Sequence, residues 1–481
     1  MVKRARKRQA LNFLLGFLLI VLSQPLSARD FFIEHRAIVS GSLERRLVAS
    51  VFKADTNDEG GDLEKASSLT PVWSAYSAGR IIGIATLGNT ICWATEEGQV
   101  YLAEAQNGQL KKSLDIGQEL SPGLSSGQSN YWLSAKDKLI GLNEEGEKVL
   151  ELSLPGPLSH QVMEDRGQLF LFFKNSLEVR DGLKGNIIWK YEPPVELSGS
   201  AVVTEKEVFI STISGQLLRL DRKNGRLKNQ YDFKEAISSI AVPDNKSILL
   251  GFVEGRVQRF VLDKNKVSWK IDLGTQRVES FLIHGKKVYV LTSGGLLFKL
   301  SLLGGNLDSW QVVPGRAFSQ PLIFREEILV LSSTPFIYGF DLKLGKQSSE
   351  TQLKYEVKTG LAVWKDLLFT GSYDFRENRS LVIAFKKEPQ VIIRASKESP
   401  QAVGRRIVFT VQASGFEKPK YEFFLSLDNE QPKLVRKASK LNTWTWIPGQ
   451  SGDYKIIVRV TDKKLSKISE LRYNITSFIG E

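Results

Sequence analysis

Short apolar runs that end at turn residues recur along this chain about every 40 residues. Gly215, Gly255 and Gly295 are spaced by that period, and each follows a run rich in β-branched and aromatic residues. Stepping along the chain by about the same interval gives turn positions at residues 98, 138, 175, 215, 255, 295 and 335. An apolar side chain stands two residues after each of them: Val100, Ile140, Leu177, Leu217, Val257, Leu297 and Ile337. Such runs predict half-buried strands, and glycine permits the positive φ of tight turns.

A second turn glycine follows ten residues after the first, and the strand behind it often carries tryptophan. The glycines are Gly108, Gly185, Gly225, Gly305 and Gly345, and the tryptophans are Trp189, Trp269 and Trp310. Four strands in about 40 residues are typical of one blade of a β-propeller. No helical apolar period follows residue 28, which excludes a βαβ fold, and a β-solenoid is the less favoured alternative.

Turns near residues 98, 138, 175, 215, 255, 295 and 335 define seven units. The segment Leu367 to Lys386 resembles two strands of an eighth, whose remaining partners would come from around Trp73 to Thr86. A ring closed by its first and last strands leaves no exposed sheet edge. We therefore predict an all-β fold whose main part is an eight-bladed β-propeller, with seven blades as the alternative.

The repeat resembles that of the pyrroloquinoline-quinone-type (PQQ-type) propellers. Residues 208–231, VFISTISGQLLRLDRKNGRLKNQY, have the family's order of strand, glycine turn, strand and second glycine turn. The run from Asp181 to Trp189 matches the docking motif D-x-x-x-G-x-x-x-W in full, whereas Asp221 and Asp341 keep the aspartate and glycine but lack the tryptophan. The resemblance covers roughly residues 37–387 and implies a propeller; it is specific for fold and not for function.

After Pro389 the 40-residue period stops. Several short strand-like runs follow between Gln401 and Asp462, ending in a G-x-Y-x-I-x-V-x-V-x-D pattern around Tyr454. This stretch resembles the small immunoglobulin-like modules of bacterial surface proteins, and we predict an immunoglobulin-like β-sandwich over residues 388–481. Tyr454 would be its corner tyrosine, with the ring in the core and the hydroxyl on backbone, and Trp444 and Trp446 are predicted to pack in the core.

The first 28 residues predict a signal peptide. A basic stretch, Lys3 to Arg8, precedes an apolar run from Leu11 to Leu22 and a small polar segment that ends at Ala28. An uncleaved anchor is the alternative, but the run is shorter than the roughly 20 residues that span a bilayer. We therefore predict export to the periplasm or the outside of the cell, with residues 29–387 forming the propeller.

Positive charge is concentrated in the last part of the chain. The formal net charge is +13, and residues 388–481 carry 16 basic and 10 acidic side chains. Basic pairs such as Arg436-Lys437, with Lys440 nearby, favour an anionic envelope surface as a partner of this module. The alternative is that these residues only solubilise the module or protect its edge strands.

The residues that carry chemistry are few and scattered. Cys92 is the single cysteine and lies in an apolar run, which predicts a buried thiol, and the three histidines, His35, His160 and His284, fall in different units. Gly123 to Gly127 matches G-x-S-x-G but lacks the strand and helix that a nucleophile elbow requires. The acidic stretch from Asp55 resembles a calcium loop, but Ala66 replaces the expected glutamate. We therefore predict no catalytic, cofactor-binding or metal-binding residues.

The quinone-dependent dehydrogenases, as the resemblance implies, use a vicinal disulfide, calcium ligands and an aspartate base. A single cysteine excludes that disulfide, so we predict a non-catalytic scaffold that binds an envelope or secreted protein. The propeller lipoprotein of the outer-membrane barrel assembly machinery has such a role, although it lacks an immunoglobulin-like tail. A glycan-binding or sensory module is the alternative function, and a quinone-dependent dehydrogenase is less favoured than either. Nucleic acid is not expected as a partner, because the protein is predicted to be exported. Exposed aromatic residues would favour a glycan, and a broad apolar patch would favour a protein partner.

Overall fold

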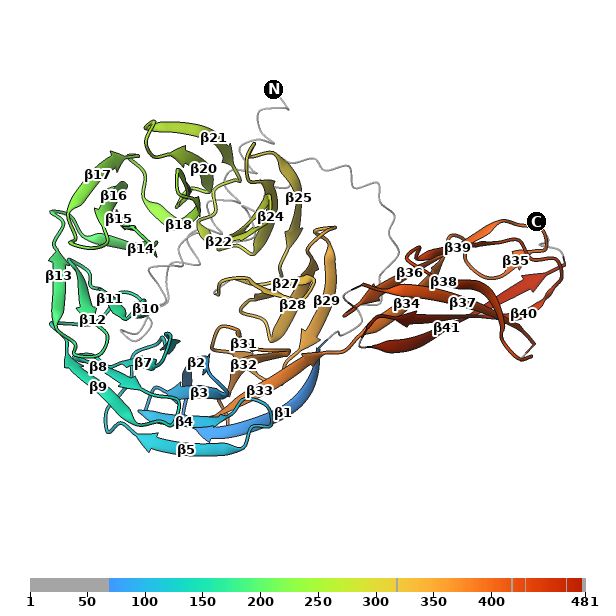
Figure 1. The fold of residues 1–481 in the computed structure, drawn as a ribbon, viewed down its shortest axis with the longest axis horizontal. Coiled ribbons are helices and arrows are strands. Elements are labelled where there is room, and N and C mark those ends of the chain that lie inside the picture. Colours follow the sequence, from blue (N-terminus) through green and yellow to red (C-terminus); the bar gives the residue numbers. More distant parts are fainter. Residues whose placement is uncertain (1–68, 317–318, 417, 429, 464, 478–481) are drawn as a thin grey trace, which may run out of the picture.

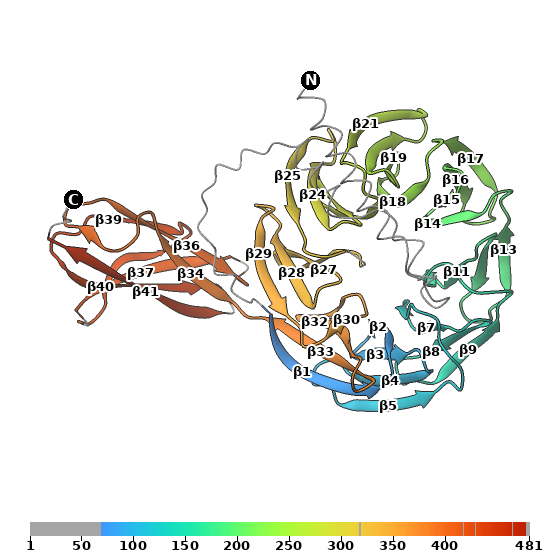
Figure 2. The same ribbon diagram turned by 180° about the vertical axis from the view of Figure 1, so that it is seen from behind.

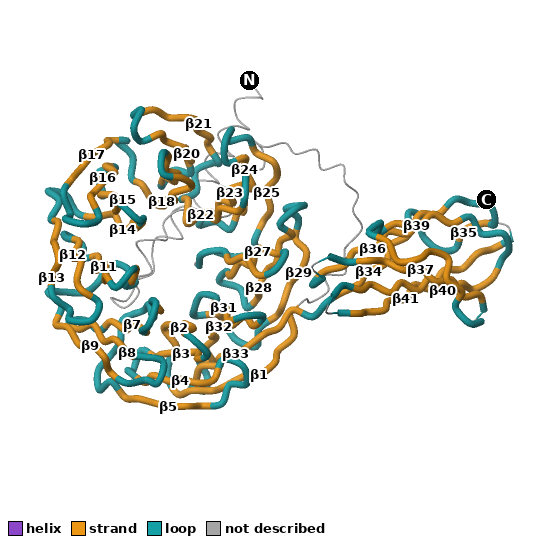
Figure 3. The backbone as a smooth tube through the Cα atoms, viewed as in Figure 1, coloured by secondary structure: helices purple, strands orange, loops and turns teal. Residues whose placement is uncertain are grey.

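The computed structural model describes residues 69–316, 319–416, 418–428, 430–463 and 465–477. A ring of antiparallel sheets forms the main body, and a smaller body of two sheets projects from it (Figures 1 and 2). All named elements of the described residues are strands (Figure 3), and none of these residues forms a helix that could cross a membrane. The predicted signal peptide, His35 and the acidic stretch from Asp55 lie outside the described residues.

Seven sheets of the ring have four strands each, paired in sequence order. The first three are β2 (Ile81–Leu87), β3 (Thr90–Thr95), β4 (Gln99–Glu104) and β5 (Leu110–Asp115); β6 (Ser125–Ser126), β7 (Tyr131–Ser134), β8 (Lys138–Leu142) and β9 (Lys148–Ser153); and β10 (Met163–Asp165), β11 (Gln168–Phe172), β12 (Leu177–Asp181) and β13 (Ile187–Tyr191). The second strand of each sheet is buried on both faces, which explains its continuous apolar run.

The next four sheets repeat this arrangement. They are β14 (Leu197–Val203), β15 (Glu207–Thr212), β16 (Gln216–Asp221) and β17 (Leu227–Asp232); β18 (Ile237–Asp244), β19 (Ser247–Phe252), β20 (Arg256–Val261) and β21 (Lys266–Asp272); β22 (Val278–His284), β23 (Lys287–Thr292), β24 (Leu296–Ser301) and β25 (Leu307–Val312); and β26 (Leu322–Phe324), β27 (Glu327–Leu331), β28 (Phe336–Asp341) and β29 (Gln347–Gln352).

The last sheet closes the ring with strands from both ends of the propeller sequence. It contains β30 (Glu356–Val357), β31 (Ala362–Trp364), β32 (Leu367–Asp374), β33 (Arg379–Lys387) and β1 (Leu69–Ala78), which pairs antiparallel with β33. Only part of the segment expected from Trp73 to Thr86 joins this sheet. The chain turns at Gly79, whose φ is +79°, and residues 81–87 then form the inner strand of the first sheet.

At several junctions of the ring, an aromatic side chain of one sheet docks on the third turn of the next sheet. The indole Nε1 of Trp189 donates to the Arg222 carbonyl at 2.8 Å, and its ring lies where a side chain at Gly225 would stand. Trp73 and Trp269 make the same bond, to the carbonyls of Ala105 and Leu302, and lie against Gly108 and Gly305. At Gly108, Gly225 and Gly305 the second glycine is therefore required by the ring of the preceding sheet as well as by its positive φ.

This arrangement predicts that Gly225→Ala lowers the free energy of unfolding by more than backbone strain alone would. The new Cβ would lie 2.4 Å from Cε3 of Trp189, so overpacking of about 1–3 kcal/mol adds to a backbone cost of about 1 kcal/mol. The control is Gly285→Ala, which has φ +57° but no atom within 4 Å of its Cβ position. Urea unfolding should show a clearly larger loss for Gly225→Ala, and equal losses would contradict the docking argument.

The smaller body has two facing sheets around one apolar core. One contains β34 (Gln390–Ala395), β36 (Ile407–Ser414) and β39 (Thr443–Trp446); the other contains β35 (Gln401–Ala402), β41 (Ser466–Thr476), β40 (Gly452–Thr461), β37 (Lys420–Leu427) and β38 (Lys433–Ser439). Trp444 and Trp446 pack against this core, as predicted. The Tyr454 ring is buried and its hydroxyl donates to the Gln450 carbonyl at 2.9 Å, which confirms the predicted environment of this residue.

A buried ion pair lies where the two bodies join. Lys387, the last residue of β33, is fully buried, and its Nζ lies 3.1 Å from Oε2 of Glu327 on the neighbouring sheet. Glu327 also accepts bonds from the hydroxyls of Ser348 and Ser349. Because β34 begins three residues after Lys387, this pair helps to fix the point at which the smaller body leaves the ring.

We predict that Lys387→Met lowers the free energy of unfolding by about 3–5 kcal/mol, because Glu327 would keep a buried charge without its partner. The double variant Glu327→Gln/Lys387→Met removes both charges and keeps an acceptor for the two serines. It should therefore recover most of the loss in thermal or urea unfolding. A single variant as stable as the parent protein would show that Lys387 is not needed to compensate Glu327.

Candidate functional site

The histidines and the serine that were considered from the sequence as possible chemical groups do not come together in the described residues. His160 packs edge-on against Phe172, with ring centroids 5.8 Å apart, and His284 is exposed at the end of β22. No group of three or more His, Cys, Asp or Glu side chains in the described residues is arranged to hold a metal ion. Ser125, in the G-x-S-x-G stretch, lies on β6 and donates its hydroxyl to the Val162 carbonyl.

Cys92 lies in the core between the first two sheets of the ring. Its side chain is inaccessible to solvent, and burial strongly raises the pKa of the thiol because the thiolate would lose its hydration. A thiol of this kind is a poor nucleophile.

We predict that Cys92 does not react with Ellman's reagent at pH 8 while the protein is folded. One thiol per chain should become reactive when urea unfolds it. The same reagent with a free-cysteine peptide provides the control. Rapid modification of the folded protein would contradict the buried environment.

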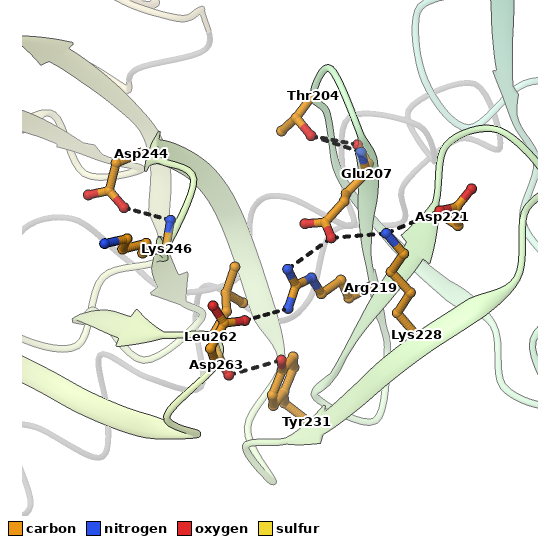
Figure 4. A network of polar contacts seen from close by, with 10 residues as sticks. All are labelled: Thr204, Glu207, Arg219, Asp221, Lys228, Tyr231, Asp244, Lys246, Leu262 and Asp263. Atoms are coloured by element: carbon orange, nitrogen blue, oxygen red, sulfur yellow. Dashed lines mark hydrogen bonds and ion pairs between the residues drawn. The ribbon is translucent and has the colours of Figure 1, made fainter.

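Many charged residues of the ring are used to fasten one sheet to the next. Figure 4 shows Arg219 between Glu207, at 2.8 Å on its own sheet, and Asp263, at 3.1 Å on the next. Burial opposes the charge of Arg219, but its bonds to the two carboxylates outweigh that effect and raise its pKa. In the same region the Tyr231 hydroxyl donates to the Leu262 carbonyl. This network joins one sheet to the next and is a structural contact rather than a binding site.

The turns of the ring gather on two faces. In a four-stranded antiparallel sheet the first and third turns lie at one end and the second turn at the other. We call one end of the ring the third-turn face, because it holds the turns before the fourth strands β5, β9, β13, β17, β21, β25 and β29. We call the opposite end the second-turn face. β33 runs from its second turn to Lys387, so the smaller body leaves from the third-turn face.

The third-turn face exposes large aliphatic side chains. Leu183, Leu303 and Leu344 occupy the turns themselves and are 81%, 63% and 65% exposed. Leu110 and Ile187 begin the strands that follow such turns and are also exposed. Asp181 and Asp341 hold two of these turns by accepting backbone N–H bonds through their carboxylates. The leucines are thus presented on fixed turns, and the sequence pattern alone did not single them out.

Two of the basic residues on which the anionic-surface hypothesis rests lie at the edge of a sheet. Arg436 and Lys437 lie on β38, the edge strand of the five-stranded sheet, and the pairing of β38 with β37 contains two register shifts. Charged residues and bulges are devices that protect edge strands from pairing with other chains. This position favours the alternative stated from the sequence, that the charges protect an edge.

Comparison with known proteins identifies the repeat type. Residues 70–247 match the family described as outer membrane protein assembly factor BamB. Among solved structures, BamB from Moraxella catarrhalis aligns with 14% identity and a TM-score of 0.55, over 66% of this chain and 99% of that chain. The C-terminal WD40 domain of Sif2 aligns with 13% identity and a TM-score of 0.56, over 67% and 99%.

A quinohemoprotein alcohol dehydrogenase, ADHIIG from Pseudomonas putida HK5, also aligns, with 8% identity and a TM-score of 0.52 over 67% of this chain and 77% of that chain. No curated protein matches the sequence. At these identities the structural likenesses establish the propeller fold, which proteins of different function share.

Proposed function

We propose that this chain, a propeller repeat protein of the PQQ type, is a non-catalytic scaffold that binds a protein partner in the bacterial cell envelope. The proposal includes eight blades, one for each sheet of the ring, over residues 29–387, and an immunoglobulin-like module over residues 388–481. It also includes export by the predicted signal peptide of residues 1–28.

The observation that carries this proposal is the exposure of leucines on separate third turns around the same face of the ring. Leu183, Leu303 and Leu344 are held on rigid turns, so little conformational entropy is lost when a partner covers them. Exposed aliphatic groups gain free energy when a protein surface removes them from water. β33 ends at the third-turn end of the closing sheet, so the chain enters the smaller body from this same end of the ring.

A quinone-dependent dehydrogenase is a weaker candidate, although one such enzyme shares the fold. The single cysteine, Cys92, is in the core and has no second cysteine with which to form a vicinal disulfide. We expect the purified protein neither to bind pyrroloquinoline quinone nor to oxidise alcohols with it, with or without calcium. A stoichiometric quinone complex would overturn the non-catalytic proposal.

The scaffold proposal predicts that Leu183→Asn, Leu303→Asn and Leu344→Asn, combined, reduce capture of the partner at least tenfold. Partner capture is measured by crosslinking in intact cells followed by mass spectrometry, with equal amounts of each variant. Substitutions at exposed side chains should change the free energy of unfolding by less than about 0.5 kcal/mol each.

The matched control is Ile213→Asn/Val253→Asn, which changes exposed aliphatic residues on the second-turn face. It should leave partner capture unchanged. If the control variant lost partner capture and the leucine variant kept it, the partner would dock on the second-turn face, and our proposal would be wrong.

A further inference from the structure

The closing sheet carries four aromatic side chains on the second-turn face. Tyr76 comes from β1, Tyr355 from the loop before β30, Tyr373 from β32 and Phe375 from the second turn. Phe375 is 61% exposed and Tyr76 is 48% exposed, and the other two rings are partly exposed. We call these four residues the aromatic cluster. Only the pairing of β1 with β33 brings its members together from opposite ends of the propeller sequence.

Each exposed ring of the aromatic cluster is covered on one side by a cation of the same protein. The guanidinium carbon of Arg379 lies 4.7 Å from the ring centroid of Tyr76, and Nζ of Lys358 lies 4.9 Å from that of Phe375. A cation over a ring is attracted by the negative face of the π system. These contacts hold the rings in place, so binding to them costs less side-chain entropy.

Polar groups between the rings are also fixed. The Tyr373 hydroxyl donates to Oδ1 of Asn378 at 2.6 Å. Arg379 pairs with Asp374 at 3.5 Å, and Lys358 pairs with Glu356 at 3.0 Å. The surface is therefore a set of rings separated by amide, carboxylate and guanidinium groups.

Lys354 contributes a positive charge that no carboxylate in the described residues pairs with. Its Nζ lies 3.4 Å from the Tyr76 hydroxyl and 5.2 Å from the ring centroid of Tyr355. Hydrogen bonding with Tyr355, and then with Tyr76, raises the pKa of Lys354, so it stays protonated. Arg376 and Glu377, both exposed in the adjoining turn, have opposite charges and offset each other.

We propose that the aromatic cluster and Lys354 form a binding site for an acidic saccharide. The C–H face of a pyranose ring carries a partial positive charge that suits the negative face of Phe375 or Tyr76. The sugar hydroxyls can bond with the fixed polar groups, and the sugar carboxylate pairs with Lys354. This site lies on the face opposite the leucines, so it goes beyond the scaffold function and does not depend on it.

The composition of the cluster favours a saccharide over a protein segment. The centre of a protein interface is depleted of Lys, Asp and Glu, because burying these charges without full compensation is costly. Charged groups lie within about 5 Å of the exposed rings of this cluster, as the distances above show, so no dry apolar centre is available. A saccharide needs none, because it presents hydroxyl groups along its edges.

The test uses the mature full-length protein and measures binding by saturation-transfer NMR and calorimetry. Three probes are compared: tetragalacturonate, which is acidic, neutral maltotetraose, and an oligomer of glutamate. Tetragalacturonate should bind, and Phe375→Ala should weaken it about tenfold. Lys354→Gln should reduce the affinity for tetragalacturonate to that for maltotetraose. It should leave the affinity for maltotetraose unchanged. The control variant Val253→Ala, at an exposed residue of another second turn, should bind like the parent protein.

Two results would overturn the proposal. One is the absence of tetragalacturonate binding, or binding that Phe375→Ala and Lys354→Gln leave unchanged. The other is binding of the glutamate oligomer at least as tight as that of tetragalacturonate and lost in both variants, which would assign the cluster to an acidic protein segment. Circular dichroism of each variant distinguishes loss of binding from loss of fold. Neither result bears on the leucine face.

Discussion

The contact on which the ring depends is the docking of an aromatic side chain from one sheet onto the third turn of the next. Each such contact combines packing of a large ring with a hydrogen bond to a turn carbonyl. Where tryptophan is absent, other donors bond to the same part of the turn: Tyr231 to Leu262, and Tyr289 and Lys299 to Leu342. Different residues can therefore make the same kind of bond at different junctions.

The same docking contact is used where the ring closes. Trp73 lies on β1 and fastens the closing sheet to the third turn of the first sheet, so the N-terminal strand supplies both an edge partner for β33 and an aromatic contact for Gly108. A closed ring presents its turns as two rigid faces. Exposed residues on those turns are therefore held at fixed separations even though they come from distant parts of the sequence.

Periodicity predicted the strands and the turn glycines, because half-buried strands and positive φ leave a local signature in residue type. It could not predict which sheet a motif serves. The complete motif from Asp181 to Trp189 lies within one repeat, yet Trp189 docks on Gly225 of the next. The exposure of Leu303 and the meeting of Tyr76 with Arg379 could not be predicted either, because both depend on packing between segments far apart in the chain.

The two faces differ in the chemistry that their exposed side chains can support, and the cause is the position of each residue in the sheet. Leu183, Leu303 and Leu344 in the third turns are more than half exposed, so only a covering surface can remove these aliphatic groups from water. At the closing sheet, by contrast, β1, the loop before β30 and the second turn converge, and cations from these segments reach the rings. The place where the chain closes its ring is thus also the place where rings and charges are interleaved.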